Sequence, residues 1–353
     1  MVSWEFPPTI VGGLGRHVGA LVSALRALGH EVRVIAPDAA PPLRTGSLLQ
    51  QVADSQAQVI ARGRRACRGW RPDVVHGHDW LTGPAATSLA ASTGAPLVTT
   101  VHSTEAGRQQ GYLTTPLQRA IDEHERTLVR ASAGVLVCSE FMAGQVTGHF
   151  GVAAAVIGNG CAAPGSTNTA AHGERVPARI AFAGRLVHEK GLQELIKALP
   201  LLSEEFPDVH LVVAGSGPLA AAQRDRAERY RVADRISWHG FVDPDSVLAR
   251  ASVVVVPSLY EPFGLVALEA QAAGTPVAVA DTGGLRELVA DGVTGVLFRP
   301  EDPAAIAAAV TRLWRAPARA TAMAGAAQRR AHAQFSWPAV AARVAAQYRR
   351  CTR

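Results

Sequence analysis

The strongest constraint on the fold of this chain is an alternation of short apolar runs with longer helical patterns. In the first half, apolar residues recur at helical spacing over 16–28 and 116–130. The runs that read as strands lie at 31–36, 73–76, 96–101 and 134–138. Strands that alternate with helices form parallel sheets, so the first half predicts an α/β domain. Met1 to Trp4 look like the last half of a first strand, so either this strand is short or the native start lies upstream of Met1.

The alternation is interrupted once, at 162–178, by a stretch rich in Ala, Gly, Pro, Ser and Thr that predicts an interdomain linker. It then restarts, with strands predicted at 179–183, 210–214, 235–239, 252–257, 276–280 and 295–298. A chain of 353 residues is also too long for one ordinary core. We therefore predict two doubly wound, Rossmann-like domains, at 1–165 and 176–337. The last residues, 338–353, predict a helix that packs back toward the N-terminal domain.

Composition excludes several classes of protein. The net charge is +6, but no basic run is interleaved with aromatic residues, so we expect no nucleic-acid partner. The four cysteines are scattered, which favours free thiols in a reducing cytoplasm. No apolar run reaches the roughly 18–20 residues of a membrane span. We expect a cytoplasmic protein without a transmembrane segment, whose oligomeric state the sequence leaves open.

Glycines and cations follow two of the predicted strands. Gly12 and Gly13 lie in a turn before the first helical pattern, where the backbone can approach an anion such as pyrophosphate; a tight turn without a ligand is the alternative. In the loop 184–191, Arg185 and Lys190 are placed to clamp a diphosphate. The alternative there is a surface ion pair with Glu189.

A third segment, 261–269, begins and ends with a glutamate. The segment is predicted to start in a loop, at Glu261, and to end inside a helix, at Glu269. Eight positions along a helix are slightly over two turns, so both carboxylates can face the same crevice. The first suits sugar hydroxyls and the second suits the two hydroxyls of a ribose. Gly264 and Leu265 between them predict a helix N-terminus whose amides suit a phosphate.

Together, Glu-x7-Glu at 261–269, Gly-Arg-x4-Lys-Gly at 184–191 and Gly-Gly-Leu-Gly at 12–15 resemble the retaining glycosyltransferases of family 4, which have the two-domain GT-B fold. The N-terminal half is most similar to the bacterial glycogen synthase and α-glucan glucosyltransferase branch, through the segments 3–8, 76–80 and 102–105. Family 4 enzymes that glycosylate lipids or small metabolites share such segments. The chain departs from the family at 157–162, where Pro-Asn-Gly-Val-Asp is replaced and only Asn159 and Gly160 are retained.

The resemblance implies roles for individual residues. Catalysis is assigned to His102 and Asp79 on the reacting face, to Arg185 and Lys190 on the departing diphosphate, and to Glu261. Donor binding is assigned to Gly12, Gly13, Arg185, Lys190, Glu261, Gly264, Leu265 and Glu269. Acceptor candidates are Glu105 and Arg108. Without this resemblance, the sequence would favour a structural role for His102.

Metal ligation is not expected. Asp243 and Asp245 match a D-x-D pattern but open a predicted helix, where aspartates commonly cap. His76, His78 and Asp79 have metal-binding side chains, but a strand-end turn explains them better. The segment 215–218 lacks the third glycine of a nicotinamide site. We therefore expect no cofactor.

The resemblance implies transfer of a hexose, with glucose favoured, from a nucleotide diphosphate sugar to an acceptor. An α-glucan or maltooligosaccharide is the favoured acceptor, and a lipid or a small metabolite is the alternative. Retention would follow a front-side route in which the leaving phosphate helps to deprotonate the acceptor. Two other classes stay open: a nucleotide-sugar epimerase of the same fold and a non-catalytic nucleotide-binding module.

Overall fold

The computed structural model describes residues 1–8, 12–37, 48–162 and 175–352. They form two compact units, Met1–Gly160 with Trp337–Arg353, and Cys161–Ser336. Most of the predicted linker and the predicted domain limit at 165 fall on 163–174, outside the described residues.

The first unit contains a parallel sheet of four strands in the order β1-β2-β3-β4. These strands are β1 (Val75–His78), β2 (Leu97–Val101), β3 (Gly134–Val137) and β4 (Ala155–Val156). Val2 bridges to Gly77 of β1 on one side and to Ile35 on the other. The chain order along the sheet therefore reverses between Val2 and β1, and such a switch point opens a crevice at the carboxyl ends of the strands.

The strand predicted at 31–36 is wrong as a regular strand. Ile35 forms an isolated bridge, through its N–H to Met1 (2.8 Å) and its carbonyl oxygen to the N–H of Ser3 (3.1 Å), and the Arg33 carbonyl oxygen accepts the amino group of Met1 (2.7 Å). The Val2 segment is its neighbour on one side, so the ladder is too short to extend the pairing.

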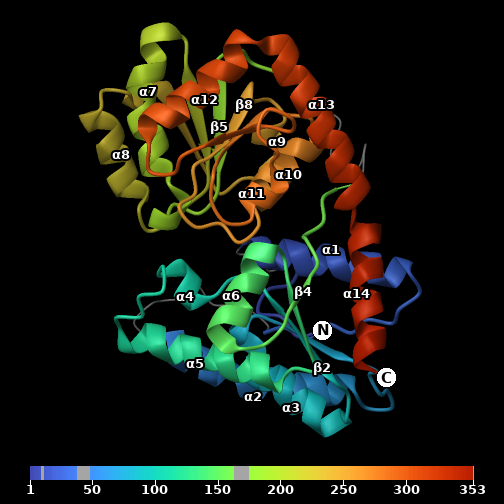
Figure 1. Cartoon of the computed structure of the whole chain (residues 1–353). Helices are drawn as coiled ribbons and strands as arrows, with labels where there is room; N and C mark the ends of the chain where they lie inside the picture. The colour runs from blue at the N-terminus through green and yellow to red at the C-terminus, as the bar shows by residue number, and fades with distance from the viewer. Residues whose placement is uncertain (9–11, 38–47, 163–174, 353) are drawn as a thin grey trace. The chain divides into compact units, whose positions relative to one another are not determined.

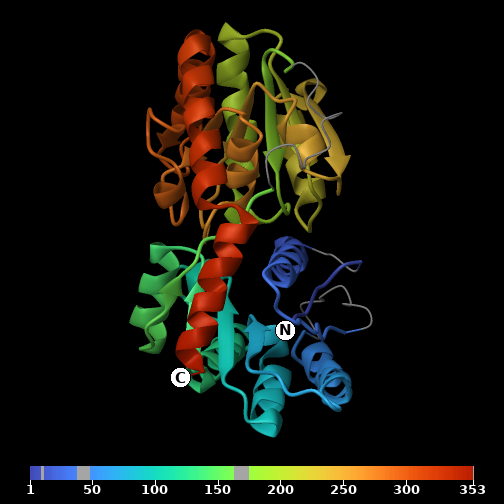
Figure 2. The ribbon, with the colours of Figure 1, turned by 90° about the vertical axis from the view of Figure 1, so that its right-hand side faces the viewer.

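Helices cover both faces of this sheet (Figure 1). The first unit contains α1 (Gly13–Ala27), α2 (Leu48–Ala66), α3 (Gly83–Thr93), α4 (Glu105–Arg108), α5 (Pro116–Ala131), α6 (Glu140–Phe150) and α14 (Trp337–Cys351). One buried cluster joins α2, α3 and α5 to β1 and β2, and another joins α1 and α14 to β2 and β3. Figures 1 and 2 show α14, in red, beside α1 and against the sheet. The C-terminal helix thus completes the core of the first unit.

The second unit contains six parallel strands in the order β10-β9-β8-β5-β6-β7. Their bounds are β5 (Arg179–Ala183), β6 (His210–Ala214), β7 (Ile236–Gly240), β8 (Val253–Val256), β9 (Val277–Ala280) and β10 (Val296–Phe298). The order reverses between β5 and β8, which is the Rossmann topology. The loops that follow β5 and β8 therefore lie side by side at the switch point.

The helices of this unit also lie on both faces of its sheet. They are α7 (Leu192–Glu205), α8 (Ala220–Arg229), α9 (Asp245–Leu248), α10 (Leu265–Ala272), α11 (Leu285–Leu288), α12 (Pro303–Arg315) and α13 (Pro317–Gln334). Helix α7 packs against α12 and α8, whereas α10 packs against α9 and α13. All side chains of β8 and β9 are buried, as expected for strands covered on both faces. In the described part of the chain, no helix has the length and apolarity needed to cross a membrane.

Candidate active site

Asp79 follows β1 in the first unit and holds an unusual backbone conformation. Its φ of 56° and ψ of 173° lie in a region that residues with a Cβ rarely adopt, at a cost of about 1–3 kcal/mol. The conformation is held by an N–H bond to the Thr100 carbonyl (3.0 Å) and by Oδ1, which accepts the N–H of His102 (2.8 Å). Asp79 thus fixes the start of the loop after β2.

Burial shifts the protonation of both side chains. It raises the pKa of Asp79 to about 6, against the opposing effects of the His102 N–H and of Arg108. Burial also lowers the pKa of His102 to about 4. Near neutral pH the pair is therefore a carboxylate beside a neutral imidazole, with the carboxylate fixing the backbone of the histidine.

Further histidines surround His102, and one of them, His17, was not among the residues predicted from the sequence. His78 Nδ1 lies 3.1 Å from His102 Nε2, and the ring of His17 from α1 meets His102 edge-on at 4.7 Å between centroids. The available signal was that His17 lies on one helical line with Leu21 and Leu25, both buried. A histidine at a core position of an amphipathic helix is a reason to look for a partner.

His76 differs from its neighbours because both of its ring nitrogens are used. Nδ1 lies 2.7 Å from the Tyr348 hydroxyl of α14, and Nε2 lies 2.7 Å from Thr100 Oγ1. His76 therefore ties the C-terminal helix to the sheet.

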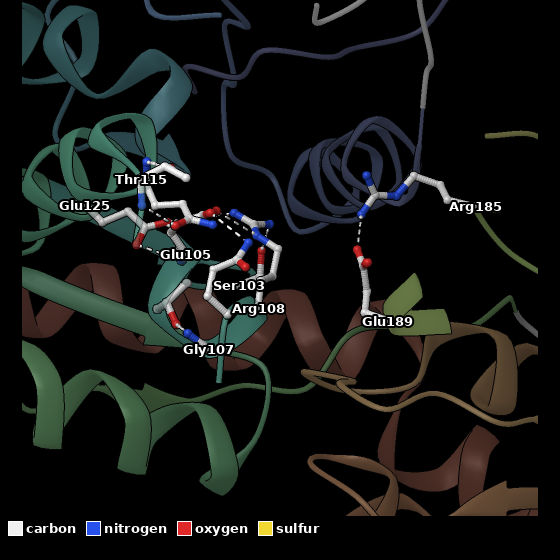
Figure 3. A network of polar contacts seen from close by, with 11 residues as sticks. Ser103, Glu105, Gly107, Arg108, Thr115, Glu125, Arg185 and Glu189 are labelled. Atoms are coloured by element: carbon white, nitrogen blue, oxygen red, sulfur yellow. Dashed lines mark hydrogen bonds and ion pairs between the residues drawn. The ribbon is translucent and has the colours of Figure 1, made fainter. Parts of the chain in front are cut away.

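The acceptor candidates Glu105 and Arg108 lie on α4, within a network of polar contacts (Figure 3). Arg108 donates to Ser103 Oγ (2.6 Å) and to Glu105 Oε2 (3.3 Å). Both carboxylate oxygens of Glu125 accept the N–H of Glu105, at 3.0 Å each. Thr104 caps the short helix by accepting the N–H of Gly107 at 3.0 Å.

Glu125 of α5, which the sequence analysis did not single out, is the buried centre of this network. Its side chain is 4% exposed and lies 3.9 Å from Arg108. Burial raises its pKa to about 8, although the N–H of Glu105 and the charge of Arg108 act in the opposite direction. A change in the protonation of Glu125 near neutral pH therefore alters the hydrogen bonds to the segment that carries the acceptor candidates Glu105 and Arg108.

In the second unit, the predicted cations occupy the loop after β5. Arg185 is 62% exposed and pairs with Glu189 at 3.4 Å (Figure 3), so the surface ion pair considered as the alternative does form. Lys190 Nζ lies 2.9 Å from Glu261 Oε2, which also accepts the Ser258 hydroxyl at 3.1 Å. Since Lys190 follows β5 and Glu261 follows β8, this ion pair joins the two loops at the switch point.

Glu261 and Glu269 do not share one helix. Helix α10 begins only at Leu265, after Gly264 with φ of +106°, so Glu261 lies on the preceding loop and Glu269 is half-buried on the helix. The predicted placement, with the first glutamate on a loop and the second inside a helix, is confirmed, whereas the count of two helical turns does not apply because only Glu269 is helical. Gly264 and Leu265 do form the helix N-terminus, whose first N–H groups have no acceptor within the helix.

The glycine turn of the first unit is described only in part, because 9–11 lie outside the described residues. Gly12 is the N-cap of α1 and Gly13 its first residue. The N–H of Gly12 donates to Glu5 Oε2 at 2.8 Å. A diphosphate that bound this amide would have to replace the Glu5 carboxylate.

The aspartates of the D-x-D pattern lie at the start of α9 (Asp245–Leu248), on either side of its N-cap Pro244. Asp243 Oδ1 accepts the N–H of Asp245 (3.2 Å), which is the first residue of α9. The four cysteines are all free thiols.

Comparisons with known proteins define the class to which this fold and these sites belong. The sequence matches a model described as Glycosyltransferase Family 4 over 11–162 and one described as Glycosyl transferases group 1 over 170–330. The structure is similar to sucrose-phosphate synthase of Thermosynechococcus elongatus, with a TM-score of 0.81 and 25% identity over 99% of this chain and 98% of that one. The two Rossmann-like units are thus those of a GT-B glycosyltransferase.

Two curated relatives make the assignment more specific. A glycogen synthase of Mycobacterium tuberculosis is 39% identical over 386 residues, covering 99% of this chain and 93% of that protein. A D-inositol 3-phosphate glycosyltransferase of Segniliparus rotundus is 35% identical over 88% of this chain and 73% of that protein. The chain belongs to the family 4 glycosyltransferases and is an enzyme of the glycogen synthase-like type.

Proposed function

We propose that this enzyme transfers glucose from a nucleotide diphosphate sugar to an α-glucan or maltooligosaccharide, with retention of anomeric configuration. The observation that carries the donor half of the proposal is the ion pair between Lys190 and Glu261 at 2.9 Å. It places a cation and a carboxylate together at the switch point of a Rossmann sheet, where such folds bind nucleotides. The 39% identity with a glycogen synthase supports the acceptor half.

On the donor side, Arg185 and Lys190 supply positive charge for the diphosphate. Arg185 is 62% exposed, and among the described residues its side chain contacts Glu189 at 3.4 Å, a weak surface pair that it can leave for a phosphate at little cost. Lys190 is more buried and already oriented by Glu261. Their charges stabilise the diphosphate as the sugar leaves, which is the usual role of such cations in transfer reactions.

The same pair of loops offers groups for the rest of the donor. Glu261 has one oxygen engaged by both Lys190 and Ser258, which fixes its carboxylate for sugar hydroxyls. The N-terminal amides at Gly264 and Leu265 suit a phosphate oxygen. Glu269, one turn further along α10, is assigned to the ribose.

On the acceptor side, Asp79 and His102 form the reacting face. The strained backbone of Asp79 supports this role, because rare conformations cluster at functional sites. Retention is proposed to follow the front-side route, in which the leaving phosphate deprotonates the attacking hydroxyl and no carboxylate forms a bond to the sugar. Glu105 and Arg108 are proposed to contact the acceptor beyond the reacting hydroxyl.

A small-molecule acceptor is the second candidate, and the relative named a D-inositol 3-phosphate glycosyltransferase favours it. Arg108 would then act on an anionic group of the acceptor rather than on a neutral glucan. A lipid acceptor, the absence of a metal requirement and a cytoplasmic location stay predictions from the sequence.

The test is a donor and acceptor screen with the purified chain. UDP-, ADP- and GDP-glucose are each incubated with and without maltooligosaccharide or inositol phosphate, while nucleotide release and product mass are followed. Glucan-dependent release with added hexose units supports the proposal, and NMR of the new linkage shows whether the α configuration is kept. Product formed from donor alone would indicate an epimerase, and nucleotide binding without turnover a non-catalytic module.

A further inference from the structure

Three histidines from separate elements of the first unit converge on one point. His17 comes from α1, His78 ends β1 and His102 follows β2. One ring nitrogen from each lies within 4.8 Å of the others. His17 and His78 are 7% and 0% exposed, and His102 is half-buried. His17 and His78 are therefore enclosed by the protein, whereas part of the His102 side chain is accessible to solvent.

All three rings are neutral near pH 7. Burial lowers the pKa of His17 and His78 well below 6.5, and the neighbouring rings add to this effect. Each neutral imidazole carries one N–H and one lone pair. Three rings therefore bring three lone pairs to a site that excludes most water.

Hydrogen bonding within the described residues does not use all of these nitrogens. His78 Nδ1 and His102 Nε2 share one contact at 3.1 Å, which takes one proton. His17 Nδ1 and His78 Nε2 are buried and have no partner among the described residues. A buried polar atom without a partner costs about 1–3 kcal/mol, so two of them in one cluster indicate a site that takes a ligand.

We propose that His17, His78 and His102 bind a divalent transition-metal ion of the zinc type. Three imidazoles with an open fourth position are a familiar ligand set for such an ion. In a tetrahedral site the ligand nitrogens lie about 3.4 Å apart, as follows from metal–nitrogen distances of about 2.0–2.1 Å. The 4.8 Å span exceeds this spacing by about 1.4 Å, so the ring nitrogens would have to move closer by that amount to enclose an ion.

The chemistry of the cluster selects the class of ion. Neutral imidazole suits zinc, cobalt, nickel and copper, whereas magnesium and calcium require oxygen ligands. His76 is not a ligand, since Tyr348 and Thr100 occupy both of its nitrogens. Asn159 forms a hydrogen bond with the His17 ring and orients it. Histidines that bind metals usually have such a hydrogen-bond partner on the ring nitrogen that does not contact the metal.

This ion would not be a cofactor for transfer. If His102 acts on the reacting face, as the proposed function holds, then a metal on the same ring withdraws it from the acceptor and inhibits the enzyme. Inhibition rests on the proposed function, whereas metal binding does not. The two claims can thus fail separately.

The experiment is a titration of untagged, chelator-treated full-length chain with Co²⁺. Tetrahedral Co²⁺ bound by nitrogen gives visible absorption bands, and Zn²⁺ should remove them in competition. We expect saturation at one ion per chain. His17→Gln should weaken metal binding by about tenfold to a hundredfold or more, because the loss of a residue that only hydrogen-bonds to a metal ligand already lowers metal affinity by that factor.

The matched control is His30→Gln, which removes an exposed histidine of the same unit and should leave the affinity unchanged. His78→Gln provides a second ligand variant if His17→Gln does not fold, and circular dichroism checks the fold of each. Three results would overturn the proposal: no saturable binding, unchanged affinity in a folded ligand variant, or near-ultraviolet thiolate bands that place the ion on cysteine. Water joining the three rings is then the explanation of the unpartnered nitrogens.

Discussion

Replacing Glu125 with glutamine should remove a large part of the pH dependence of stability of the first unit. Glu125 is 4% exposed, and burial raises its pKa from 4.5 to about 8. The folded state therefore holds a proton that the unfolded chain releases above pH 4.5. Binding of this proton contributes to the free energy of unfolding. The contribution is fully present below the pKa of the unfolded state and is lost as the pH rises through the pKa of the folded state.

The magnitude follows from the two pKa values. With 4.5 in the unfolded and about 8 in the folded state, the contribution near pH 6 is roughly 3 kcal/mol and near pH 9 it is close to zero. The wild type should thus lose about 3 kcal/mol more than Glu125→Gln between these values. At a urea slope of about 2 kcal/mol per M, this is a difference of about 1–2 M in the shift of the midpoint.

The assay is urea unfolding of both proteins near pH 6 and pH 9, followed by tryptophan fluorescence. Glutamine keeps the size of the side chain and one oxygen that can accept the N–H of Glu105, so the network should persist. The matched control is Glu123→Gln on the same helix, where the side chain is 71% exposed. Equal midpoint shifts for the wild type and Glu125→Gln would refute the assignment of a buried, neutral carboxyl group at this position.

Three further substitutions test other parts of the structure. Arg185→Ala should lower turnover about a hundredfold, as expected for one contact to a departing phosphate, and should leave the thermal midpoint unchanged because the side chain is 62% exposed; near-normal turnover would contradict the role. Gly191→Ala should destabilise the second unit by about 2 kcal/mol or more in urea unfolding, since φ is +70° and a Cβ would overlap the carbonyl oxygen of Pro257. Tyr348→Phe should cost about 1–3 kcal/mol because it leaves buried His76 Nδ1 without its partner, and an unchanged unfolding midpoint would show that the contact is not needed.

The sequence alone determined the class of fold and the positions of the loops that we propose to bind the donor. Hydrophobic alternation is a local signal, so all six strands of the second unit were predicted to within one residue at each end. The two loops proposed to bind the donor were found because glycines and charged residues after predicted strands are visible in the sequence. The failure at 31–36 has a long-range cause, because an apolar run does not reveal how many residues its neighbour in the sheet offers for pairing.

Tertiary structure decided which of these residues meet. The pairing of Lys190 with Glu261 depends on the reversal of strand order between β5 and β8, which no spacing along the chain encodes. His17 and Glu125 looked like ordinary helix residues, since their partners lie on other elements of the unit. Their burial, and with it the pKa of Glu125 and the neutral state of the histidines, arises only when α1, α5 and the strand ends pack together and exclude water. Local pattern thus sets the elements, while long-range packing sets the chemistry of the site.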